Sequence, residues 1–121
     1  MPQYLRLWLL ALLLWLPQAQ GQTQVAGRTE LPAIARAELS AEARDTLRAI
    51  EQGGPYAYER DGTVFKNYER VLPQQSRGYY REYTVKTPGA RNRGARRIVC
   101  GKLPECYYSP DHYRTFKRIR E

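Results

Sequence analysis

The sequence is poor in several residue types, and each shortage narrows what the protein can be. One histidine and two cysteines in 121 residues are too few for a zinc site with four nitrogen or sulfur ligands. Only 12 acidic residues stand against 20 basic ones, which gives a net charge of +8. This balance excludes an acidic, solvating chain and favours polyanionic partners. Both tryptophans, Trp8 and Trp15, belong to one apolar run near the start.

That apolar run, residues 7–16, follows the positive charge of Arg6. A run of ten residues does not cross a hydrocarbon core of roughly 30 Å as a helix. Pro17 ends the run, and Ala19 and Gly21 supply the small residues that a signal peptidase needs. We therefore expect residues 1–21 to be a secretory signal peptide, with a buried hydrophobic helix as the weaker alternative. The protein would then be secreted, periplasmic or extracellular, with no membrane anchor.

The 100 residues after this segment are enough for one domain. They keep a net charge of +7, because Arg6 is the only charged residue among the first 21. Residues 22–38 are expected to be an N-terminal lead-in and residues 39–121 the folded domain, acting as a monomer.

Cys100 and Cys106 are separated by five residues. Export would place them in an oxidising compartment, where a local disulfide is favoured over free thiols. Zinc binding is the other alternative, but His112 would add only a third ligand.

One helix and several short strands are expected in the domain. Ser40 can cap a helix whose apolar residues recur at Ala43, Leu47 and Ile50, and Gly53 can end it. Short runs rich in tyrosine, valine, threonine and isoleucine predict strands near residues 63–65, 79–85, 96–100, 106–108 and 113–119. The pattern indicates an α+β fold, with one N-terminal helix packed on a twisted antiparallel β-sheet.

The residues that could perform chemistry lie in the second half of the chain. Residues 91–97 contain four arginines, whose planar guanidinium groups suit phosphate oxygens. Glu82 is expected on the same strand face as Tyr80 and Thr84, and His112 is the only imidazole. A carboxylate, an imidazole and guanidinium groups are suited to metal-free cleavage of a phosphodiester. Composition alone favours a solvated basic face for polyanions, so this alternative stays open.

Three segments, residues 61–73, 79–98 and 107–113, closely resemble the secreted microbial guanyl-specific ribonucleases, the family of barnase and ribonuclease Sa. The similarity runs from about residue 39 to residue 116, in the same order and with nearly the same spacing. The resemblance implies a helix packed on a twisted antiparallel sheet, with the active site on the concave face of the sheet. It also implies transfer of the RNA 2′-hydroxyl onto its own 3′-phosphate, which gives a 2′,3′-cyclic phosphate that is hydrolysed more slowly to a 3′-phosphate.

The resemblance also implies roles for individual residues. Glu82 would be the general base and His112 the general acid, while Arg93 and Arg97 would hold the phosphate. Tyr113 is expected among the substrate-binding residues. No metal and no cofactor are expected.

Guanine recognition is expected from a second set of residues, again by resemblance. Phe65 would lie against the base, and backbone groups of Lys66, Asn67 and Tyr68 would address O6 and N7. Glu69 would accept the hydrogens of N1 and N2, two adjacent donors that only guanine offers on that edge. The alternative makes Asn67 a turn residue and Glu69 a solvated charge. Tyr68 stands where barnase-like members have arginine.

The expected partner is an RNA substrate, and a barstar-like acidic protein inhibitor is left open. The alternative function is a secreted basic protein that binds nucleic acid without catalysis, which the composition fits equally well. A cleavage assay in EDTA distinguishes the two functions.

Overall fold

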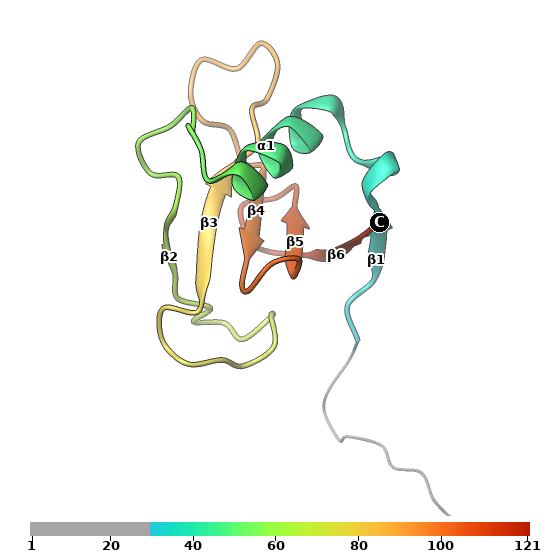
Figure 1. Ribbon diagram of the computed structural model, residues 1–121, viewed down its shortest axis with the longest axis vertical. Coiled ribbons are helices and arrows are strands. Elements are labelled where there is room, and N and C mark those ends of the chain that lie inside the picture. The colour runs from blue at the N-terminus through green and yellow to red at the C-terminus, as the bar shows by residue number, and fades with distance from the viewer. Residues whose placement is uncertain (1–29) are drawn as a thin grey trace, which may run out of the picture.

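The computed structural model describes residues 30–121, in which one helix packs on a six-stranded sheet (Figure 1). The expected signal peptide, residues 1–21, and residues 22–29 of the expected lead-in lie outside the described residues. The elements in chain order are β1 (Ala33–Ala35), the 3-10 helix η2 (Arg36–Glu38), α1 (Ala41–Gln52), β2 (Thr63–Phe65), β3 (Tyr80–Thr84), β4 (Arg97–Cys100), β5 (Cys106–Ser109) and β6 (Lys117–Arg120). In the described part of the chain, no helix has the length and apolar character to cross a bilayer.

Helix α1 begins and ends at the residues that the sequence predicts. The Ser40 hydroxyl accepts a hydrogen bond from the Ala43 N–H at 3.1 Å, which satisfies one of the donors exposed at a helix start. Gly53 ends the helix with a φ of 80°, a left-handed conformation that glycine adopts without steric cost. Ala43, Leu47 and Ile50 are buried. The predicted helix over residues 41–52 is confirmed.

The sheet is mixed, with the strand order β1-β6-β5-β4-β3-β2. Strands β2 to β6 pair with antiparallel neighbours, as expected. Strand β1 was not expected, because it falls within the segment 22–38 that was interpreted as a lead-in. It pairs in parallel with β6 through Ala33 and Arg118, so the sheet is mixed at this edge and antiparallel elsewhere. The predicted α+β fold, with one helix packed on a sheet, is confirmed.

The last strand is shorter than predicted and begins later. The expected strand over residues 113–119 is wrong in its first half, because β6 starts at Lys117. His112 and Tyr113 have φ values of 56° and 74°, which no strand accommodates. The Asp111 carboxylate accepts the Thr115 N–H at 2.9 Å and the Thr115 hydroxyl at 2.7 Å. These contacts hold a turn where residue types alone predict a strand.

Alternation of side chains along the strands gives the sheet two different faces. Tyr83 and Val85 belong to the cluster that packs under α1, together with Leu39, Ala43, Leu47, Ile50, Ile98, Cys100, Cys106 and Ile119. The other face carries a smaller cluster of Leu72, Tyr80, Val99, Tyr107 and Phe116. Glu82 pairs with Val99, and Thr84 pairs with Arg97. Glu82, Thr84 and Arg97 therefore lie on the face away from α1.

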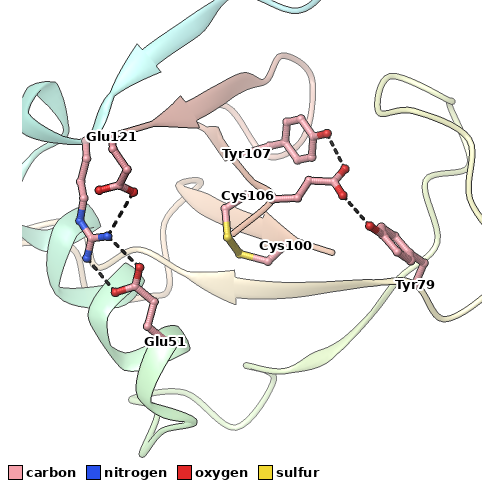
Figure 2. The surroundings of a disulfide bond; sticks show 8 residues. Glu51, Tyr79, Cys100, Cys106, Tyr107 and Glu121 are labelled. Carbon is pink, nitrogen blue, oxygen red and sulfur yellow. Dashed lines mark hydrogen bonds and ion pairs between the residues drawn. A yellow bond between two sulfur atoms is a disulfide. The ribbon is translucent and has the colours of Figure 1, made fainter. Parts of the chain in front are cut away.

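A disulfide joins Cys100 and Cys106, which are paired residues of β4 and β5 (Figure 2). This is the local bond that the sequence favoured. Next to it, the Glu105 carboxylate accepts hydrogen bonds from the hydroxyls of Tyr79 and Tyr107 at 2.5 and 2.6 Å (Figure 2). The bond and the carboxylate together fix the turn between the two strands.

Candidate active site

A cavity of about 400 Å³ opens on the sheet face away from α1. Glu82 lines it from β3, His112 and Tyr113 from the segment after β5, and residues 65–69 from the end of β2 and the loop that follows. The residues expected as general base and general acid therefore share one cavity with those expected to recognise guanine. Arg93 and Arg97 do not line it.

The two carboxylate oxygens of Glu82 have different surroundings. The residue is 6% exposed. Its Oε1 accepts a hydrogen bond from the Tyr113 hydroxyl at 2.6 Å and lies 3.5 Å from Nη2 of Arg93. Its Oε2 lies 3.9 Å from Nη2 of Arg60 and has no hydrogen bond from residues 30–121. One oxygen is thus held by the protein, and the other can accept a proton.

Tyr113 links the Glu82 carboxylate to a buried guanidinium. Its hydroxyl donates to Glu82 and accepts a hydrogen bond from Nε of Arg97 at 3.1 Å. Burial, and then the hydrogen bond to Glu82, raise the pKa of Tyr113 to about 12. The phenol therefore stays protonated at neutral pH and can keep donating. The resemblance suggested a substrate contact for Tyr113, and the structure adds a contact with the expected general base.

The two arginines expected to hold phosphate lie directly behind this group. Arg93 donates from Nε and Nη2 to the Thr84 hydroxyl at 3.0 and 2.8 Å. Arg97 is 2% exposed, and its Nη1 donates to the Arg96 carbonyl at 2.8 Å. Among residues 30–121, Nη2 of Arg97 has no hydrogen-bond partner. Arg93 contacts Glu82, and Arg97 contacts Tyr113. Both contacted residues line the cavity, so the two positive charges lie close behind its wall.

His112 is presented to the cavity by a strained turn. His112 and Tyr113 are consecutive residues with positive φ, which is uncommon outside glycine and is concentrated at functional sites. The His112 N–H donates to the Ala95 carbonyl at 2.8 Å, and the Tyr113 N–H donates to the buried Ser109 hydroxyl at 2.9 Å. These backbone bonds fix the turn while the imidazole stays exposed.

The loop after β2 presents a row of backbone donors. The side chain of Asn67 accepts from the Leu72 N–H at 3.2 Å and donates to the Leu72 carbonyl at 3.0 Å. Asn67 is therefore a turn residue, with a φ of 54°, and the loop closes on a buried anchor. Within the described part of the chain, the N–H groups of residues 66–69 have no hydrogen-bond acceptor. Glu69 lines the cavity next to them.

Arg60 is a member of the cavity that sequence reasoning missed. It precedes Asp61, whose carboxylate accepts the Thr84 N–H at 2.8 Å, while the Gly62 N–H donates to the Glu82 carbonyl at 2.8 Å. These bonds hold the loop beside β3. The Arg60 side chain is 65% exposed, so its charge reaches the open cavity. The adjacent turn signal Asp61-Gly62 indicated a loop but no partner for Arg60.

Sequence similarity relates the chain to known ribonucleases. A family model described as ribonuclease matches residues 21–120. Guanyl-specific ribonuclease St of Saccharopolyspora erythraea is 56% identical over 81 residues, which cover 67% of this chain and 80% of that protein. Guanyl-specific ribonuclease Sa of Kitasatospora aureofaciens is 58% identical over 82 residues, with 67% and 85% covered.

Solved structures give the same result at the level of the fold. A structure of ribonuclease Sa2 in complex with mononucleotides superimposes with a TM-score of 0.76 at 49% identity, and covers 78% of this chain and 98% of that one. A structure of ribonuclease Sa2 with 3′-GMP superimposes with a TM-score of 0.70 at 50% identity, with 74% and 97% covered.

Proposed function

This chain belongs to the microbial guanyl-specific ribonuclease family, and from that membership we propose which of its residues cleave RNA and how. The protein is a guanyl-specific endoribonuclease. Family membership also sets aside the alternative of a basic protein that only binds nucleic acid. The observation that supports the assignment best is the shared cavity of Glu82, His112 and Glu69.

The proposed reaction begins at the Oε2 atom of Glu82, the oxygen left without a hydrogen bond. This atom accepts the proton of the ribose 2′-hydroxyl as the 2′-oxygen attacks the adjacent phosphorus. The bond from phosphorus to the 5′-oxygen of the next nucleotide breaks, and the protonated imidazole of His112 gives that oxygen a proton. The products are a 2′,3′-cyclic phosphate and a free 5′-hydroxyl. Water then opens the cyclic phosphate to a 3′-phosphate, with the two roles exchanged.

Fixed positive charge stabilises the phosphate as negative charge builds on its oxygens. Arg93 and Arg97 are held by hydrogen bonds to other protein groups, so they need little reorganisation when substrate binds. The exposed guanidinium of Arg60, 3.9 Å from Glu82, adds a third cation at the rim of the cavity.

Guanine is proposed to bind between Phe65 and the exposed ring of Tyr68. The N–H groups of residues 66–68 are donors without acceptors among residues 30–121, which suits the guanine acceptors O6 and N7. The Glu69 carboxylate suits the two donors N1 and N2. Adenine has a hydrogen-bond acceptor at N1, which cannot donate to the Glu69 carboxylate and would repel it.

The protein is further proposed to act outside the cytoplasm as a monomer, with residues 1–21 removed. The apolar run of residues 7–16 and the Cys100–Cys106 disulfide support export. An acidic protein inhibitor of the barstar type would complement the net charge of +7 of residues 22–121. Sequencing the N-terminus of the exported protein tests the first of these proposals, and the expected first residue is Gln22.

Incubation of the purified protein with RNA in EDTA tests the mechanism. We expect cleavage after guanosine, with 2′,3′-cyclic phosphate ends that appear before 3′-phosphates. His112→Gln should bind RNA and cleave it far more slowly. Retention of RNA without cleavage, or activity that is lost in EDTA and restored by magnesium, would show that the mechanism is wrong.

A further inference from the structure

A second hollow lies beside the active-site cavity and contains neither Glu82 nor His112. Its volume is about 240 Å³. Residues 65–68 line both the hollow and the cavity, so the loop after β2 is the wall between them. Residues 74–78, which lead into β3, form the opposite wall. This connection runs along the lower end of the sheet in Figure 1.

The charge of the hollow suits a phosphate. Lys66 and Arg77 line it, and no carboxylate does. Two cations without a counter-charge favour a polyanion. The amide of Gln75, which also lines the hollow, has both donor and acceptor atoms and can meet the edge of any base. The polar groups therefore match both parts of a nucleotide.

One exposed aromatic ring, that of Tyr68, gives the hollow a stacking surface, and the buried ring of Tyr80 forms part of the hollow's wall. Tyr80 is 3% exposed, and its hydroxyl donates to the Pro73 carbonyl at 2.6 Å, so its ring is fixed in place. Tyr68 is 80% exposed and borders both the hollow and the cavity. Base stacking on aromatic side chains is a common way of binding single-stranded nucleic acid without sequence preference.

The position of the hollow relates it to the same RNA chain. Tyr80 and Glu82 lie on one face of β3, two residues or roughly 7 Å apart along the strand. A nucleotide in the hollow would thus be next to the guanosine in the cavity. His112, which protonates the leaving 5′-oxygen on the 3′ side of the cleaved bond, lines the cavity and not the hollow. A nucleotide bound in the hollow, next to the guanosine but away from His112, would therefore lie on the 5′ side of the guanosine.

We propose that this hollow is a subsite for the nucleotide on the 5′ side of the cleaved guanosine, with Arg77 contacting its phosphate. The proposal rests on the proposed function, because the direction of the RNA chain follows from the role of His112.

Cleavage of the dinucleotide GpC and the trinucleotide CpGpC tests the subsite, since only the second has a 5′ nucleotide. We expect the wild-type kcat/KM to be higher for CpGpC, and Arg77→Gln to reduce that advantage by on the order of tenfold. Cleavage of GpC by Arg77→Gln should be unchanged, which also shows that the variant is folded. The logarithmic salt slope of CpGpC binding should become shallower by about 0.7, the change expected when the protein neutralises one phosphate fewer on a single strand.

Arg120→Gln is the matched control, because it removes the same charge from β6, which is separated from β2 and β3 by other strands. If Arg77→Gln and Arg120→Gln lost equal amounts of kcat/KM for CpGpC, the effect would come from the overall charge of the protein and not from a subsite, and the proposal would be overturned. Equal wild-type rates for GpC and CpGpC would also overturn it, as would a loss of GpC cleavage in Arg77→Gln. A failure of the proposed function looks different: the wild type would not cleave GpC at all, or would not prefer it to ApC.

Discussion

Replacing Tyr113 by phenylalanine tests the active site by removing a single oxygen atom. The hydroxyl donates to Glu82 at 2.6 Å and accepts from Arg97 at 3.1 Å. Both partners are charged, and they are 6% and 2% exposed. A hydrogen bond to a charged group contributes about 1.5 to 3 kcal/mol, and an unpaired buried partner adds a penalty. We expect Tyr113→Phe to lower the free energy of unfolding by roughly 2 to 3 kcal/mol, or the melting temperature by about 10 °C or more.

Tyr107→Phe is the matched control for this change. Its hydroxyl also donates to a carboxylate at 2.6 Å, that of Glu105, and its ring is buried, but it does not line the active-site cavity. We expect a similar loss of stability with unchanged cleavage of GpC. Tyr113→Phe should in addition lower kcat by roughly 10- to 100-fold, because Glu82 loses the group that orients it.

The pH dependence of stability gives an independent check on Tyr113. Its pKa is raised to about 12 in the folded protein, first by burial and then by the hydrogen bond to Glu82, above the value of about 10 for a free phenol. The stability that this shift contributes is present below pH 10 and is lost as the pH rises toward 12. The difference in unfolding free energy between wild type and Tyr113→Phe should therefore be constant below pH 10 and then narrow. Equal activity of the two proteins, or a difference independent of pH, would refute the role given to this hydroxyl.

The guanine site, the acid–base pair and the disulfide each give a further prediction. Glu69→Ala should depress cleavage after guanosine far more than after adenosine, by about 1.5 to 3 kcal/mol in transition-state free energy, and equal losses in kcat/KM for GpC and ApC would contradict its role. Rate against pH should be bell-shaped, because Glu82 must be deprotonated to accept a proton and His112 protonated to donate one; Glu82→Gln should remove the acidic limb and His112→Gln the alkaline one, each with a loss on the order of 10² in kcat. Replacing Cys100 and Cys106 by serine should cost about 2 kcal/mol of stability by the chain-entropy estimate, measured by denaturant unfolding, while intact-mass analysis of the wild type should find no thiol that can be alkylated before reduction.

The elements that the sequence predicts correctly are those whose ends depend on neighbouring residues. Ser40 and Gly53 act within one turn of α1, so a reader of the sequence sees both the cap and the residue it satisfies. The placement of Glu82 on the face of Tyr80 and Thr84 follows from the two-residue repeat of a strand. Such features need no knowledge of distant contacts.

The elements that the sequence does not predict depend on partners far along the chain. β1 is three residues long, and its residues, such as Ala33, pair with β6 at the opposite end of the chain. The adjacent Arg36 forms two hydrogen bonds to Glu51 on α1, at 2.7 and 2.8 Å. No local alternation indicates either contact. The turn at residues 111–115 is missed for the opposite reason, since its aromatic and threonine residues favour a strand in isolation.

The resemblance identifies residue types at the active site but not how they are connected. Arg97, Tyr113 and Glu82 form one hydrogen-bonded chain from β4, the turn after β5 and β3. This chain binds Oε1 of Glu82 and leaves Oε2 toward the cavity, with Arg60 beside it. One carboxylate therefore has a structural oxygen and a reactive oxygen. Because the same hydrogen bond from Tyr113 holds both β3 and the Glu82 carboxylate, we expect stability and catalysis to be coupled at this residue. The equivalent bond from Tyr107 to Glu105 should affect stability alone.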